Sequence, residues 1–112
     1  MRFERFSNAT IIRISTNHDK TLRVITEQKT ISEIVNFAIE HGDDWGTPVF
    51  GTPVAKVRAN IYQGDKFLGD LGIGTNFLTA QGCRYFQSRS VSKKDRAELI
   101  SLFGVPDPYE TK

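Results

Sequence analysis

The sequence has few of the features, such as cysteines and long apolar segments, that most readily indicate where a protein acts and what it does. Its 112 residues include a single cysteine, Cys83, so no disulfide can form within the chain, and this agrees with a reducing compartment. No apolar run approaches the length of a membrane span, and the first residues lack the apolar segment and cleavage site of a signal peptide. We therefore expect a cytoplasmic protein that does not associate with a membrane.

Neither sign of charge is in clear excess. Fifteen Lys and Arg against thirteen Asp and Glu give a net charge of +2, which is too small to indicate nucleic acid or an anionic membrane as the partner. Eight Phe, three Tyr and one Trp are enough large side chains to close a core without disulfides. A chain of this length has room for one core, so we expect one domain over residues 1–112, with a short C-terminal tail from about residue 105.

Several segments have the composition of strands. ATIIRIST and TLRVIT are joined by the polar NHDK and predict one hairpin, VAKVRANIYQGDKFLGDLGIG predicts a second, and NFLTA and RYFQSRSV are shorter candidates. In the second hairpin a three-residue connection, QGD, opposes Ile61 to Phe67 and Val57 to Leu71, which keeps one face apolar. A two-residue turn at residues 64–65 divides the apolar residues between both faces, unless a glycine bulge shifts the register.

Two further segments predict helices. Apolar residues recur at helical spacing in TISEIVNFAIEHG, where Thr30 and Glu33 match a capping box and Gly42 ends the pattern. In SKKDRAELISLFG, Ser92 has the position of a cap and Gly104 that of a terminator. The predicted order is therefore β-β-α-β-β-(β)-β-α. This order favours an α+β domain with a mainly antiparallel sheet and two helices at one face or end.

The stretch GDLGIGTNF is the nearest approach to a nucleotide-binding motif. Its glycines follow the order G-x-x-G-x-G, with no helix after them, whereas dinucleotide binding needs G-x-G-x-x-G between a strand and a helix. A P-loop lysine is also missing, so we expect no cofactor. Gly72 and Gly74 instead leave bare backbone beside Arg58, Tyr62 and Asp70. That strip is interpreted either as sheet curvature under a helix or as a partner site.

No catalytic or metal site is indicated by residue spacing. Cys83 has no histidine at a family-type spacing, because His18 lies in a predicted turn and His41 at a helix end. His41, Asp43 and Asp44 are metal-ligand types, but further ligands are missing, and a helix C-terminus explains His41 equally well. We therefore predict no enzymatic activity, no metal and no cofactor.

Two stretches have the composition of binding surfaces. EHGDDWGTPVFG offers acids and a tryptophan, which suit the rim and anchor of a protein interface, although Trp45 can instead cap the core. CRYFQSRSVSKKDR interleaves cations with aromatic residues, as in proteins that bind single strands, although it can equally be a solvated edge or face an acidic protein. The candidate partner-binding residues are Asp43, Asp44, Trp45, Arg58, Tyr62 and Asp70. The candidate nucleic-acid-binding residues are Arg84, Tyr85, Arg89, Lys93 and Lys94.

In size and layout, as a short cytoplasmic α+β chain without catalytic residues, the protein resembles the small bacterial immunity proteins that neutralise a cognate toxin by masking its active site. Those proteins share no motif, so no residue role is carried over. The resemblance implies a non-catalytic, protein-binding function, and a basic toxin such as a nuclease would suit Asp43, Asp44 and Asp70. The alternative is a nucleic-acid-binding protein that uses the stretch from Arg84 to Arg96.

Overall fold

The computed structural model describes residues 3–47, 54–81 and 86–109. One antiparallel sheet has the strand order β2-β1-β3-β4-β5-β6. Its strands are β1 (Ile11–Thr16), β2 (Thr21–Ile25), β3 (Val57–Gln63), β4 (Lys66–Ile73), β5 (Phe77–Gln81) and β6 (Phe86–Ser90). The helices are α1 (Gln28–Glu40) and α2 (Lys93–Phe103), with a short 3-10 helix, η1 (Glu4–Asn8), before β1. The predicted α+β class and the order of the strands and main helices are confirmed.

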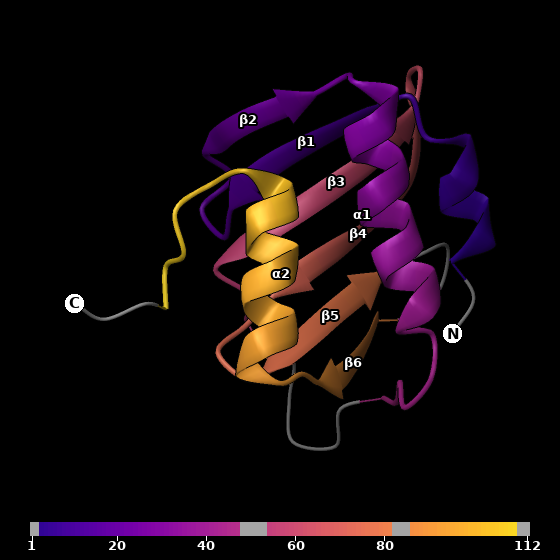
Figure 1. Cartoon of the computed structure of the whole chain (residues 1–112). Coiled ribbons are helices and arrows are strands. Elements are labelled where there is room, and N and C mark those ends of the chain that lie inside the picture. Colours follow the sequence, from indigo (N-terminus) through magenta and orange to yellow (C-terminus); the bar gives the residue numbers. More distant parts are fainter. Residues whose placement is uncertain (1–2, 48–53, 82–85, 110–112) are drawn as a thin grey trace.

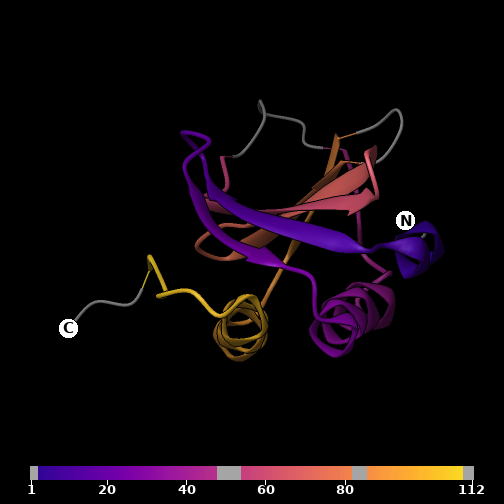
Figure 2. The ribbon, with the colours of Figure 1, turned by 90° about the horizontal axis from the view of Figure 1, so that it is seen from above.

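Both main helices pack against the same face of the sheet, side by side (Figures 1 and 2). Alternate strand residues point into the layer between sheet and helices, where Ile14 of β1, Ala59 of β3 and Leu71 of β4 are fully buried. Ile34 of α1 and Leu99 of α2 close this layer from the helix side. The core therefore lies between the sheet and one layer of helices.

The intervening strand residues point to the opposite face, on which no helix of the described chain lies (Figure 2). Arg13 of β1 lies opposite Asn60 of β3, and Asn60 lies opposite Asp70 of β4. Arg58 and Tyr62 alternate with the buried residues of β3 on the same side. We call this the helix-free face of the sheet.

Among the described residues, no helix is both long and apolar enough to cross a membrane.

The ends of the two helices differ in how well they were predicted. In α2, the Ser92 hydroxyl accepts a hydrogen bond from the Asp95 backbone N–H (3.1 Å), and Gly104 ends the helix in the left-handed region at φ 70°, as predicted. For α1, the predicted Thr30 cap is wrong. The helix begins at Gln28, and Thr30 lies within its first turn, where its hydroxyl donates to the Glu27 carboxylate (3.2 Å).

The register of the β3–β4 hairpin also differs from the prediction. Its connection is a two-residue turn at 64–65, not the three-residue QGD, and the alternative, a bulge, is present after Ile61 and shifts the pairing. Ile61 therefore lies opposite Gly69, and Val57 lies opposite Ile73 in place of Leu71. Each pairing partner on β4 is thus two residues further along the chain than predicted, and a shift by two residues keeps each side chain on the same face of the sheet. The prediction that one face stays apolar is therefore confirmed for this part of the hairpin, while the register itself is wrong.

Candidate protein-binding surface

An exposed aromatic pair lies on the helix-free face where the bulge interrupts β4. Leu68 is the extra residue of the bulge and is buried, and this reverses the side to which Phe67 points. Phe67 was expected on the apolar face, but it lies opposite Tyr62 and is 47% exposed. The two rings meet edge to face, with centroids 5.5 Å apart. This geometry is favourable between aromatic rings, so the pair is an ordered feature of the surface.

Arg13 extends this pair across the neighbouring strand. Its guanidinium donates to the Asp19 carboxylate (3.1 Å) and to the Thr21 hydroxyl (3.0 Å). The hydrogen bond to Asp19 raises the pKa of Arg13, and the proximity of Tyr62 adds to this effect. Arg13 is therefore a fixed positive charge beside the rings. Val24, which lies opposite Arg13 in the sheet, is 55% exposed. We call Arg13, Val24, Tyr62 and Phe67 the aromatic patch.

Asp70 is on the same face but is not an exposed acid. Its side chain lines a hollow of about 130 Å³ together with Arg58 and Thr79, and only 8% of Asp70 is exposed. Burial raises the pKa of Asp70, while the charge of Arg58 and the backbone N–H of Gln81 oppose that shift. The structure thus brings Arg58, Tyr62 and Asp70 onto one face, as predicted from strand alternation, but it buries the carboxylate.

Gly72 and Gly74 do not form a bare strip. A Cβ atom on Gly72 would stand 2.7 Å from the Ala55 Cβ and 3.2 Å from the Arg58 Cγ, and one on Gly74 would overlap the ring of Phe77. Both glycines are buried beneath side chains of the same chain. The predicted cover by a helix is therefore wrong, because side chains of the same chain cover both glycines, and these side chains also leave no bare backbone for a partner.

The predicted residues of the loop after α1 lie elsewhere. Trp45 packs edge to face on Phe3, with ring centroids 5.3 Å apart, and its Nε1 donates to the His41 carbonyl (2.6 Å). Trp45 is half-buried and covers the end of the core. Asp43 and Asp44 are exposed, but Asp43 is paired with an arginine of β6. The loop lies beside β6, through a bridge at Gly46, and not beside the aromatic patch.

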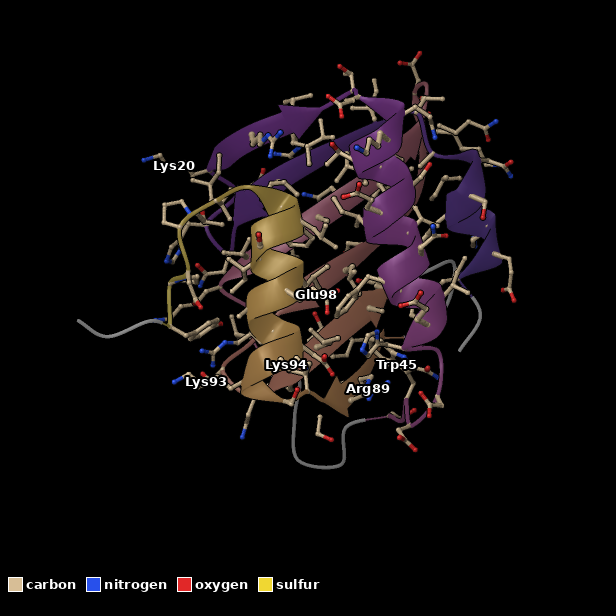
Figure 3. The ribbon with its side chains drawn as sticks, in the orientation of Figure 1. Lys20, Trp45, Arg89, Lys93, Lys94 and Glu98 are labelled. Atoms are coloured by element: carbon tan, nitrogen blue, oxygen red, sulfur yellow. The ribbon has the colours of Figure 1, made fainter. Side chains whose placement is uncertain are left out.

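The candidate nucleic-acid residues are also dispersed. Arg89 is turned toward the end of α1, where its Nη1 donates to the carbonyls of His41 and Asp43 (3.0 Å each) and to the Asp43 carboxylate (3.2 Å). Its side chain is only 13% exposed. Lys93 and Lys94 are exposed at the start of α2 (Figure 3). The remaining candidates, Arg84 and Tyr85, and also Cys83, lie outside the described residues.

His41 has structural contacts on both ring nitrogens. Its ring stacks on Phe37 with centroids 4.0 Å apart, its Nδ1 lies 2.8 Å from the Phe37 carbonyl oxygen, and its Nε2 lies 3.4 Å from the Asp95 carboxylate. These contacts connect the end of α1 to α2. In the described part of the chain, no group of three or more His, Cys, Asp and Glu residues is placed to hold a metal ion.

No protein-family model, curated protein or solved structure matches the chain. A function can therefore be assigned only from the surfaces of the chain itself. Tyr62 of the aromatic patch was predicted from the sequence as a site residue, whereas Arg13, Val24 and Phe67 were not. Strand alternation could have placed Arg13 beside Tyr62, whereas the position of Phe67 depends on the bulge.

Proposed function

We propose that the protein is a non-catalytic protein-binding module that contacts its partner through the aromatic patch. One observation carries the proposal: Phe67 is 47% exposed on a face without a described helix, although it lies in a chain with many fully buried apolar side chains. Its ring packs edge to face on Tyr62, and Arg13 lies on the neighbouring strand of the same face. Tyrosine, phenylalanine and arginine are enriched in protein interfaces, and rigid rings lose little conformational entropy on binding.

Within this class, we propose an immunity or inhibitor protein that masks a cognate toxin or enzyme in a bacterial cytoplasm. The small α+β layout supports this, but the acids named for a basic toxin support it unequally. Asp44 is exposed, whereas Asp43 accepts a hydrogen bond from Arg89 and Asp70 is buried. We therefore assign the main contact to the aromatic patch and only electrostatic steering to Asp44.

The proposal is tested by capture of the partner on tagged protein in cells that produce this chain. Wild type should retain one stoichiometric protein, and Phe67→Ala should reduce its retention at least about tenfold, as expected for an interface anchor. Ile39→Ala is the matched control, because Ile39 is a large apolar residue on α1 and is 39% exposed. Equal retention by the two variants, or no stoichiometric protein at all, would contradict the proposal.

Nucleic-acid binding is the alternative, and the adjacent exposed Lys93 and Lys94 support it. Fluorescence anisotropy with a labelled single-stranded oligonucleotide tests it. Binding that weakens steeply with salt, and further in Lys93→Ala/Lys94→Ala, would favour this alternative over the protein-binding proposal. If no salt-dependent binding is measured, the alternative is rejected.

A further inference from the structure

A second surface feature is a largely apolar hollow at the other end of β1 and β3 from the aromatic patch. Its volume is about 560 Å³, within the range of ligand-binding clefts. It lies between the β1–β2 turn and the segment that follows α2, and Lys20 projects from that turn on the same side of the molecule (Figure 3). The described residues that line it are Thr16, Asn17, His18, Lys20, Leu22, Lys56, Val57, Pro106 and Pro108.

The segment that contains Pro106 and Pro108 forms one side of the hollow and is attached to the sheet by hydrogen bonds. The Tyr109 hydroxyl donates to the Ile73 carbonyl (2.9 Å) and accepts from the Lys56 backbone N–H (3.1 Å). Chain ends usually fray unless they are held in this way. The two prolines also restrict the backbone between these contacts and the helix. The hollow thus has a preorganised side, which lowers the conformational cost of binding.

The charged residues that line the hollow are of one sign. They are Lys20 and Lys56, and none of its described lining residues is acidic. The two nearest acids along the chain are already engaged: Asp19 pairs with Arg13 at 3.1 Å, and Asp107 accepts from the Tyr109 N–H at 2.8 Å and faces an arginine of α2. An apolar floor with a cationic rim is complementary to an apolar group flanked by carboxylates.

We propose that this hollow is a docking site for an acidic segment of a partner protein, with one large apolar side chain seated on Leu22, Val57 and the two prolines. Carboxylates on both sides of that side chain would approach Lys20 and Lys56. The Tyr62–Phe67 pair lies apart from this surface, because Thr16 and Val57 form the opposite end of the β1–β3 ladder from Tyr62, and only Arg13 of the aromatic patch reaches the β1–β2 turn. The inference therefore stands or falls independently of the proposed function.

The test is a titration of ¹⁵N-labelled full-length protein with an end-blocked peptide of sequence DEWLED, followed by amide chemical shifts. Shifts should concentrate in residues 16–22 and 56–57 and in Val105, Asp107 and Tyr109, since the prolines between them have no amide proton. A peptide of sequence DEGGED, which lacks the apolar side chains, should bind at least about tenfold more weakly. A peptide of sequence KKWLKK should leave these amides unshifted, because its charges oppose those of the rim.

Charge reversal at the rim provides the second arm. Lys20→Glu/Lys56→Glu should weaken DEWLED binding at least about tenfold. Lys93→Glu/Lys94→Glu is the matched control, since it changes the net charge equally at exposed positions of α2, and its affinity should equal that of wild type. Amide spectra of the free variants verify that both fold.

Three results would overturn the inference. The first is no shift at the hollow at any peptide concentration, and the second is equal weakening by the two double variants. The third is that the hollow binds a different ligand, which either of two observations would show. If octanoate produces the same shifts at lower concentration, the hollow binds a small carboxylate. Concentration-dependent shifts without peptide would assign it to a second copy of the chain.

Discussion

Replacing Arg89 by alanine separates a structural role from nucleic-acid binding. Its Nη1 donates to two carbonyls and one carboxylate at the end of α1, and the side chain is 13% exposed. A hydrogen bond that involves a charged group contributes about 1.5–3 kcal/mol to stability. The His41 carbonyl would keep its bond from Trp45, so the loss falls mainly on Asp43. We therefore expect Arg89→Ala to lower the free energy of unfolding by about 2–3 kcal/mol.

Urea denaturation followed by tryptophan fluorescence measures this change, because the chain has one tryptophan and Trp45 contacts the same carbonyl as Arg89. The melting temperature should fall by about 10 °C. Lys94→Ala is the control, since this exposed residue should change stability by less than about 0.5 kcal/mol. If Arg89→Ala were as neutral as the control, the contacts of Arg89 would not stabilise the fold and the reasoning would be wrong.

Three further predictions concern Gly72, Asp70 and Tyr109. Gly72→Ala should lower the free energy of unfolding, measured in urea, by about 1–3 kcal/mol, because the new Cβ would be crowded. Gly46→Ala is the control: a Cβ there would have nothing within 4 Å, so stability should change by less than about 0.5 kcal/mol. Equal effects of the two variants would contradict this prediction. Burial raises the pKa of Asp70 despite Arg58, so its contribution to stability is lost as pH rises from the unfolded value, 3.8, through the raised pKa. Stability of Asp70→Asn, measured by urea unfolding at a series of pH values, should fall less over that interval than wild type, and parallel curves would refute the assignment. Tyr109→Phe removes two hydrogen bonds and should lower the free energy of unfolding by about 1–2 kcal/mol, with faster amide exchange at Val105, Asp107 and Tyr109. Unchanged exchange would show that the hydroxyl does not hold this segment.

Much of the fold could be predicted because its signals are local. Ser92 and Gly104 bound α2 through contacts within a few residues, and these were read correctly from the sequence. Strand alternation likewise placed Arg58 and Tyr62 on one side of β3. Such features depend on backbone preferences and periodicity, which a single sequence records directly.

The register of β3–β4 was not predictable by the same means. Phe6, in a 3-10 helix to which sequence analysis assigned no element, packs on Gly69, where an added Cβ would stand 2.9 Å from its ring. Gly69 also has a φ of 150°, a conformation that favours glycine. The bulge at Leu68 therefore lies beside a contact with a residue more than 60 positions distant along the chain. Local pattern does not record such a contact, and the side on which Phe67 lies depends on the bulge.

Arginine placement explains why the net charge of +2 was uninformative about partners. Arg89 and Arg96 were counted as a basic surface, yet both are directed at backbone carbonyls, the second at the Thr75 carbonyl. Arginine can be buried in this way because its planar guanidinium satisfies several acceptors at once, whereas lysine is more strongly hydrated. The exposed cations are thus largely lysines, and Lys20 and Lys56 meet at the apolar hollow because the β1–β2 turn and the start of β3 adjoin. The charge at each part of the surface therefore depends on which arginines are buried against backbone carbonyls, and tertiary contacts determine which these are.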